Sequence, residues 1–230
     1  THLSGRWGYE YQQNVTKLTQ GLKTLQTKDL RSYGSSFFAI RPEGEQEETC
    51  GEVWFGTLQY SGNWRVDLEK FAPGELQATC GINFWDQTLM LKPGKSFTTP
   101  KMIIGYSDRG MEGASQNLAS YTREKVLYPS HRDQVRPVLY NSWYATTFDV
   151  NEEHQLALAK IAKDLGVEIF VIDDGWFKGR VNDKGGLGDW TVDKNKFPNG
   201  LQPMIQKIND MGLDFGIWIE PEMVNPNSDL

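Results

Sequence analysis

The architecture of the C-terminal half of this sequence follows from residues 167–176, Val167-Glu-Ile-Phe-Val-Ile-Asp-Asp-Gly-Trp176. This stretch is a short apolar run that ends in two adjacent carboxylates, a glycine and an indole. Parallel strands are covered on both faces, so they consist of nearly continuous Val, Ile and Phe, and ligands bind beyond their carboxyl ends. The run therefore predicts a buried parallel strand that delivers Asp173 and Asp174 to a site. The alternative is an ordinary Asp-Asp-Gly turn, since both residues are common in turns.

Two further strands and two helices flank this run. Residues 136–143 and 213–219 are apolar and end in polar or aromatic side chains. A helix is predicted over residues 151–165, because capping-box spacing at Asp149-Val-Asn-Glu152 precedes a helical apolar repeat. Gly166 stands where that helix should stop. A Gly-rich loop, residues 178–199, then leads to a second helix with Pro203 near its start and Gly212 at its end.

The resulting β-α-β-α-β order implies parallel strands with right-handed crossovers, either in a doubly wound sheet or in the opening of a (β/α)8 barrel. A nucleotide-binding sheet would have a phosphate-binding Gly-rich turn after its first strand, and this sequence has none there. The barrel is therefore favoured. Since a whole barrel takes about 250 residues, we expect residues 131–230 to form the N-terminal third of a (β/α)8 TIM barrel.

The first 130 residues are rich in short β-prone stretches separated by Gly, Pro and Asn, which favours an antiparallel sandwich. These stretches are residues 37–40, 52–60, 64–71, 75–82, 88–91 and 96–106. The apolar spacing becomes helical over residues 110–127, and residues 128–134 have the composition of a linker. The domain boundary is therefore predicted near residue 130.

Composition mainly excludes classes of function. The net charge is −6 without a Lys/Arg cluster, which argues against a nucleic-acid partner because phosphates need a basic face. No apolar run reaches membrane-spanning length. The three His and two Cys residues lack metal-ligand spacing, so no metal is expected. Cys50 and Cys80 could form a disulfide, but two buried thiols are favoured. Trp7 and Trp64 are expected to pack in the core.

Several segments, in this order along the chain, resemble the retaining α-galactosidases of glycoside hydrolase family 36. In the C-terminal half they are Arg136-Pro-Val-Leu-Tyr-Asn-Ser-Trp143, Asp173-Asp-Gly-Trp176, Gly188-Asp-Trp190, Lys196-Phe-Pro-Asn-Gly-Leu201 and Trp218-Ile-Glu-Pro-Glu-Met-Val-Asn-Pro226. In the N-terminal half they are Leu3-Ser-Gly-Arg-Trp7, Gly51-Glu-Val-Trp54, Tyr60-Ser-Gly62, Leu91-Lys-Pro-Gly94 and Phe97-Thr-Thr-Pro100. The resemblance implies that residues 1–130 are the C-terminal part of a β-supersandwich and residues 131–230 the start of the catalytic barrel.

The resemblance also implies roles for particular residues. The family's aspartate pair binds the 4- and 6-hydroxyls of galactose, which gives Asp173 and Asp174 that role here. Successive strand residues point to opposite faces, so both can reach one ligand only if the chain bends, as Gly175 permits. Trp190 matches an aromatic residue that packs on the sugar. The remaining predicted substrate-binding residues are Trp143 and Trp176, at strand ends, and Glu220, as a supporting carboxylate beside the pocket.

No catalytic residue is assigned within the chain. Retaining glycosidases use a nucleophilic and an acid/base carboxylate about 5 to 5.5 Å apart. In the family the nucleophile belongs to a Lys-Trp-Asp segment after the fourth barrel strand, and the acid/base is a later Asp. Neither segment occurs before Leu230. The chain is therefore expected to be an internal piece of the enzyme that lacks the native N-terminus and is inactive in isolation.

The complete enzyme is expected to hydrolyse terminal α-galactosides of the melibiose and raffinose type by double displacement, without a cofactor. Its expected setting is the bacterial cytoplasm, with neither nucleic acid nor membrane as partner. The resemblance also implies a homo-oligomer, since members of the family often form tetramers. Two alternatives stay open: a galactosyltransferase of the raffinose- or stachyose-synthase type, and a non-catalytic carbohydrate-binding protein. A barrel that enolises its substrate with a divalent metal is a more distant one, since Asp173, Glu220 and Glu222 follow successive strands.

Overall fold

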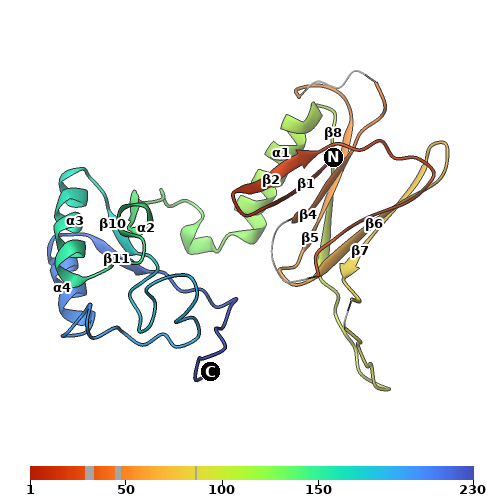
Figure 1. Ribbon diagram of the computed structural model, residues 1–230. Helices are drawn as coiled ribbons and strands as arrows, with labels where there is room; N and C mark the ends of the chain where they lie inside the picture. Colours follow the sequence, from red (N-terminus) through yellow and green to blue (C-terminus); the bar gives the residue numbers. More distant parts are fainter. Residues whose placement is uncertain (29–33, 45–47, 86) are drawn as a thin grey trace. The chain divides into compact units, whose positions relative to one another are not determined.

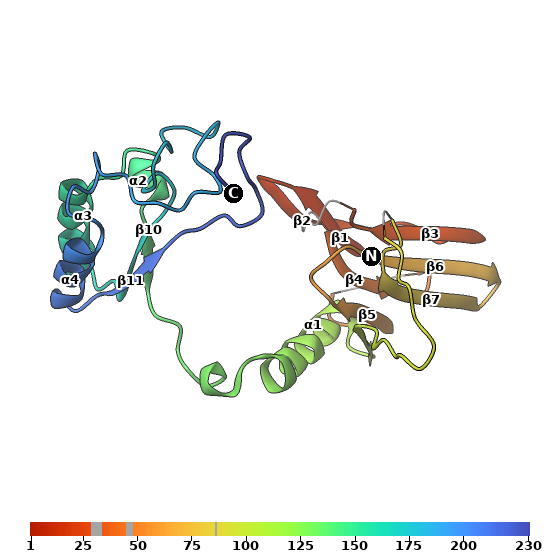
Figure 2. The same ribbon diagram turned by 90° about the horizontal axis from the view of Figure 1, so that it is seen from below.

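The structure is a computed structural model that describes residues 1–28, 34–44, 48–85 and 87–230 (Figures 1 and 2). The chain divides into two compact units, residues 1–133 and 134–230. This division falls inside the predicted linker, residues 128–134. The assignment of the two segments as domains 1–130 and 131–230 of a longer protein stays a prediction.

Unit 1 contains two antiparallel sheets. A five-stranded sheet has the order β2-β1-β4-β5-β8, and a three-stranded sheet has the order β3-β6-β7. Their strands are β1 (His2–Arg6), β2 (Tyr9–Asn14), β3 (Gly21–Gln26), β4 (Gly34–Ile40), β5 (Val53–Gln59), β6 (Trp64–Ala72), β7 (Glu75–Ile82) and β8 (Lys101–Ser107).

The side-chain alternation along β4 explains how the layers of unit 1 are held together. Phe38 packs between the two sheets, against Leu25 of β3 and Trp64 and Val66 of β6. The next residue, Ala39, faces the opposite side and packs with residues of helix α1 (Gly110–Tyr121). Successive strand residues point to opposite faces, so β4 contributes to both cores. Unit 1 is therefore a sandwich with a helix on the outer face of its larger sheet.

The chain leaves α1 through a π-helical turn, Thr122–Val126, and a 3-10 turn, Pro129–His131. The predicted helix over residues 110–127 thus consists of two helix types.

Most predicted strands of unit 1 are confirmed, with three corrections. The stretches at residues 37–40, 52–60, 64–71 and 75–82 coincide with β4 to β7. The strand predicted at residues 88–91 is wrong: these residues are exposed and pair with no strand among the described residues. The strand predicted from residue 96 begins only at Lys101. The third correction is that β1, β2 and β3 were not predicted.

Single-residue predictions in unit 1 also had mixed outcomes. Trp64 is in the core, with 6% of its surface exposed, as expected, but Trp7 is 84% exposed and the core prediction for it is wrong. Cys50 is exposed and Cys80 is half-buried, so the expectation of two buried thiols is wrong for Cys50. No disulfide joins the two sulfurs. Burial, followed by the charge of Asp67, raises the pKa of the Cys80 thiol.

Unit 2 has the predicted β-α-β-α-β order. Strands β9 (Leu139–Asn141), β10 (Ile169–Ile172) and β11 (Asp214–Ile217) form a parallel sheet in the order β11-β10-β9. A four-residue helix, α2 (Trp143–Thr146), follows β9. Helices α3 (Glu152–Asp164) and α4 (Gln202–Asp210) lie side by side against the sheet (Figures 1 and 2). Consecutive parallel strands that are neighbours in space, with helices between them, are the opening of a (β/α)8 barrel.

The local signals explain the ends of both helices. The side chain of Asn151 accepts a hydrogen bond from the backbone N–H of His154, which caps α3. Gly166 and Gly212 follow α3 and α4 with φ of 84° and 79°, the left-handed conformation that ends helices. Phe170 and Ile172 of β10 are fully buried beneath the helices, together with Met204 and Ile208 of α4. This core fixes the strand whose end carries the aspartates.

In the described ranges of the chain, none of the helices has the length and apolar character needed to cross a membrane.

Candidate functional site

Asp173 and Asp174 follow directly after the last residue of β10. The chain bends just beyond them, where Gly175 has φ of 96°. A Cβ atom at Gly175 would lie 2.8 Å from the Cα atom and the carbonyl oxygen of Phe148. The bend therefore requires glycine for two reasons, its left-handed conformation and its close approach to a neighbouring backbone.

Asp173 is half-buried and is held by polar groups from β9 and the residue after it. Its Oδ2 accepts a 2.5 Å hydrogen bond from Nδ2 of Asn141, and its Oδ1 accepts one of 2.7 Å from the backbone N–H of Asp174. Its own N–H donates to Oγ of Ser142 at 2.9 Å. A carboxylate has about four acceptor positions, so about two remain for a ligand.

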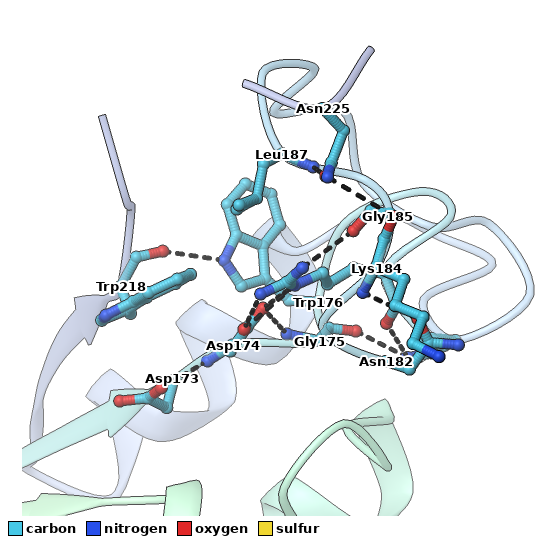
Figure 3. A network of polar contacts seen from close by, with 12 residues as sticks. Asp173, Asp174, Gly175, Trp176, Asn182, Lys184, Gly185, Leu187, Trp218 and Asn225 are labelled. Carbon is cyan, nitrogen blue, oxygen red and sulfur yellow. Dashed lines mark hydrogen bonds and ion pairs between the residues drawn. The ribbon is translucent and has the colours of Figure 1, made fainter. Parts of the chain in front are cut away.

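Asp174 has different surroundings, because it is 4% exposed and paired with a buried arginine. Nε of Arg180 lies 2.9 and 3.0 Å from the two carboxylate oxygens, and Nη2 lies 2.7 Å from Oδ2. The backbone N–H of Gly175 donates to Oδ1 at 2.7 Å (Figure 3). The two predicted binding carboxylates are thus adjacent in sequence but differ in burial and in their hydrogen-bond partners. That both face one sugar stays a prediction.

Lys196 ties together the loops around this bend. Its Nζ donates to the carbonyl oxygens of Phe148, Gly175 and Arg180, at 2.7, 2.6 and 3.2 Å. Burial lowers the pKa of the Lys196 ammonium, while the charges of Asp193, Asp149 and Asp174 act in the opposite direction. The three N–H groups of this ammonium are all used by carbonyl oxygens. Lys196 therefore stabilises the backbone around the bend and has no donor left for a ligand.

Two of the predicted tryptophans belong to an aromatic cluster beside the aspartates. Trp190 is half-buried, with its ring centroid 4.8 Å from Phe177, 6.4 Å from Trp176 and 6.3 Å from Trp218. Trp176 is only 4% exposed, and its Nε1 donates to the carbonyl oxygen of Trp218 at 3.0 Å (Figure 3). Trp176 is thus the buried member of this cluster and anchors the segment after β11. Its direct contact with sugar stays a prediction.

The other predicted site residues lie around this centre. Trp143 is half-buried and packs edge-on against Phe148 at 5.1 Å, and Phe148 in turn lies 5.3 Å from the Arg180 guanidinium. Glu220 is half-buried in the segment after β11, and Glu222 is exposed. The supporting role of Glu220 stays a prediction.

The Gly-rich loop is fastened to the last residues of the chain. Leu187 and Asn225 exchange hydrogen bonds: the Leu187 N–H donates to Oδ1 of Asn225 at 2.7 Å, and the Asn225 N–H donates to the Leu187 carbonyl at 3.0 Å. Oγ of Ser228 donates to the Asp189 carboxylate at 2.9 Å. These contacts hold the segment that carries Trp218 and Glu220 beside the loop that carries Trp190.

Sequence reasoning missed Arg180 and did not place Trp218 in the site. The available signal was an arginine six residues after the second aspartate, near the start of the Gly-rich loop. Among the described residues, no cluster of three or more His, Cys, Asp and Glu side chains is arranged to hold a metal ion.

Comparisons with known proteins show that the chain is similar to α-galactosidases. The α-galactosidase AgaA of Geobacillus stearothermophilus is 40% identical over 230 residues, which are 100% of this chain and 32% of that protein. The α-galactosidase Mel36A of Lactobacillus acidophilus is 37% identical over 229 residues, 99% of this chain and 31% of that protein. A crystal structure of a variant of AgaA in complex with raffinose matches with a TM-score of 0.93 at 40% identity, over 100% of this chain and 32% of that one.

The chain spans about a third of the length of these relatives. The family model described as the glycosyl hydrolase family 36 N-terminal domain matches residues 1–92, and the one described as Melibiase matches residues 96–230. The fold expected from the resemblance, a β-sandwich followed by the start of a TIM barrel, is confirmed by the solved structures of the family. This chain belongs to glycosyl hydrolase family 36, with its N-terminal domain segment followed by its melibiase segment.

Proposed function

We propose that this chain is the galactose-recognising part of a retaining α-galactosidase. The complete enzyme would remove terminal α-D-galactosyl residues from melibiose- and raffinose-type oligosaccharides by double displacement. The names of the relatives, and the raffinose bound to one of them, support this assignment. The nucleophile and the acid/base are expected in segments beyond residue 230, because residues 1–230 lack the Lys-Trp-Asp segment.

The observation that carries the proposal is the pair Asp173–Asp174 at the carboxyl end of β10, beside an aromatic cluster. Carboxylate oxygens accept charge-assisted hydrogen bonds from hydroxyls, which are roughly twice as strong as neutral ones. Indole rings offer broad apolar surfaces to the C–H face of a hexose. Ligands of barrel enzymes bind at this end of the strands. The arrangement therefore suits a neutral, hydroxyl-rich ligand.

The test is galactose release from raffinose and from p-nitrophenyl α-D-galactoside by the full-length protein. Asp173→Asn and Asp174→Asn should each lower kcat/KM roughly 10- to 100-fold, the loss of one or more charge-assisted hydrogen bonds. Asp183→Asn, an exposed carboxylate in the Gly-rich loop, is the matched control and should leave kcat/KM unchanged. A full-length protein that releases no galactose, or an Asp173→Asn variant with wild-type kcat/KM, would contradict the proposal.

The same assay separates hydrolysis from transfer. With p-nitrophenyl α-D-galactoside as donor and added sucrose as acceptor, a hydrolase should still release mainly free galactose, whereas a galactosyltransferase should form a galactosyl-sucrose trisaccharide. We also propose a bacterial, cytoplasmic setting and a tetramer of the full-length enzyme; the bacterial sources of the two relatives support the first part. Size-exclusion chromatography with light scattering tests the assembly.

A further inference from the structure

Arg180 is buried to the same extent as Asp174, each with 4% of its surface exposed. Besides the contacts to the carboxylate, its Nη1 donates to the carbonyl oxygen of Gly185 at 2.9 Å. Its guanidinium carbon lies 5.3 Å from the centre of the Phe148 ring and 5.9 Å from that of Phe177. The guanidinium is therefore fixed by two rings and a backbone carbonyl, independently of the carboxylate that it binds.

The ion pair with Arg180 determines how many acceptor positions of the Asp174 carboxylate stay available to a ligand. Three N–H groups, from Gly175, Nε and Nη2, make four contacts with this carboxylate, two at each oxygen, because the Nε–H is shared between Oδ1 and Oδ2. A carboxylate offers about four acceptor positions, and a shared N–H counts as one donor. About one position remains, and its direction is set by the plane of the guanidinium. An arginine fork holds a carboxylate in one plane, whereas a lysine ammonium acts as a point charge and leaves the plane free to rotate.

We propose that Arg180 is a positioning residue for galactose recognition, which holds the Asp174 carboxylate so that a single acceptor position faces the sugar. The inference rests on the proposed function and deepens it. Asp173, with two N–H donors instead of three, keeps more free acceptor positions and accepts the larger share of the ligand's hydrogen bonds. The discrimination between galactose and its 4-epimer glucose therefore depends on a residue that does not touch the sugar.

Arg180→Lys in the full-length enzyme tests this directly, because it keeps the positive charge beside Asp174 and removes the fork. The expected result is a KM for p-nitrophenyl α-D-galactoside that rises roughly 10- to 100-fold, with a smaller change in kcat. The ratio of kcat/KM between the galactoside and the corresponding α-glucoside should fall. Lys178→Gln removes an exposed cation from the same loop and should change neither quantity.

A purely structural role would give a different result. In that case Arg180→Lys would lower the melting temperature, while KM and the galactoside-to-glucoside ratio, measured well below that temperature, would stay at wild-type values. That outcome would overturn the inference. A wild-type enzyme without galactosidase activity would instead refute the proposed function, so the two failures are distinguishable.

A pair of glycine variants keeps the inference testable if Arg180→Lys does not fold. A Cβ atom at Gly186, where φ is 86°, would lie 3.0 Å from the backbone nitrogen and the Cβ atom of Arg180, whereas one at Gly179, where φ is 76°, would have its nearest neighbour at 4.0 Å. Both substitutions by alanine introduce similar backbone strain, but only Gly186→Ala displaces Arg180. A raised KM in Gly186→Ala alone supports the inference, and equal KM values in the two variants contradict it.

Discussion

Nδ2 of Asn141 donates a 2.5 Å hydrogen bond to Oδ2 of Asp173, which links the carboxyl ends of β9 and β10. The other end of the same amide is also in use, since Oδ1 of Asn141 accepts from the backbone N–H of Trp143 at 2.8 Å. The amide therefore has one orientation, with its donor toward the carboxylate. Asn141 therefore orients the Asp173 carboxylate, and Arg180 orients the Asp174 carboxylate.

Asn141→Asp should damage recognition more than Asn141→Ala. Alanine removes one charge-assisted hydrogen bond to Asp173, a contact that contributes about 1.5–3 kcal/mol to holding this carboxylate in place. Aspartate replaces the donor by a second negative charge within hydrogen-bond distance of Asp173, so the two carboxylates repel each other. The measurement is KM of the full-length enzyme for p-nitrophenyl α-D-galactoside. Asn209→Ala on the exposed side of α4 is the control, and equal KM values in both Asn141 variants would contradict the argument.

Trp176→Phe should separate the anchoring role of the indole from its packing. Phenylalanine retains an aromatic ring in the cluster but cannot donate to the Trp218 carbonyl. The half-buried Trp218 would lose the hydrogen-bond partner of its carbonyl, so the free energy of unfolding of unit 2 should fall by about 1–3 kcal/mol. Urea denaturation of the 230-residue chain measures this loss. Trp7→Phe, at an indole that is 84% exposed, should leave stability unchanged, and equal midpoints for the two variants would disprove the anchoring role.

The fold of unit 2 could be predicted because its signals are local. Asn151 and Gly166 mark the two ends of α3, and the apolar run before Asp173 has the composition of a covered strand. In unit 1 the strands that were missed depend on distant partners. β2 (Tyr9–Asn14) is almost entirely exposed, so it has no buried face that would mark it as a strand, and its pairing with β1 defines it. Conversely, residues 88–91 have strand-like composition but no partner strand in the described parts of the chain.

The site shows the same division between local and distant information. The position of Asp173 and Asp174 follows from the end of β10, which the sequence marks clearly. The partner of Asp174 does not, because Arg180 lies in a loop without periodicity, whose path is set by contacts such as that between Leu187 and Asn225. A folded loop can bring any of its cations to a carboxylate, and sequence spacing does not choose among them.

Gly175→Ala should be far more damaging than Gly166→Ala. Both glycines have positive φ, 96° and 84°. At Gly166 no heavy atom lies within 4 Å of an added Cβ, so alanine adds only backbone strain of about 1–2 kcal/mol. At Gly175 the added Cβ would also collide with the Phe148 backbone at 2.8 Å, and such overpacking costs about 1–3 kcal/mol more. Thermal unfolding of both variants measures the difference. Equal losses would show that the loop around Phe148 can give way.

Asp67 in β6 should make the stability of unit 1 depend on pH. Its Oδ1 accepts from Oγ1 of Thr24 at 2.6 Å, and its Oδ2 accepts from Nε of Arg65 at 2.8 Å. Burial acts to raise the pKa of Asp67, but the hydrogen bonds from Arg65 and Thr24 outweigh it and lower the pKa below the ordinary 3.8. A carboxyl group whose pKa is lower in the folded than in the unfolded state contributes its full stabilisation at pH values above 3.8, the unfolded-state pKa. This contribution is lost as the pH falls through the lower pKa of the folded state.

Asp67→Asn should therefore lower the melting temperature of unit 1 at pH 7, through a loss of about 1 kcal/mol, because the ion pair is partly exposed. The gap between the wild type and this variant should narrow as the pH falls below 3.8, since the wild-type carboxylate then gains a proton and no longer differs in charge from asparagine. Calorimetry between pH 2 and pH 7 follows the gap. Thr24→Val removes one of the two donors and should show the same trend with a smaller amplitude. A gap that stays constant over this range would mean that the charge of Asp67 contributes nothing to the stability of the sandwich.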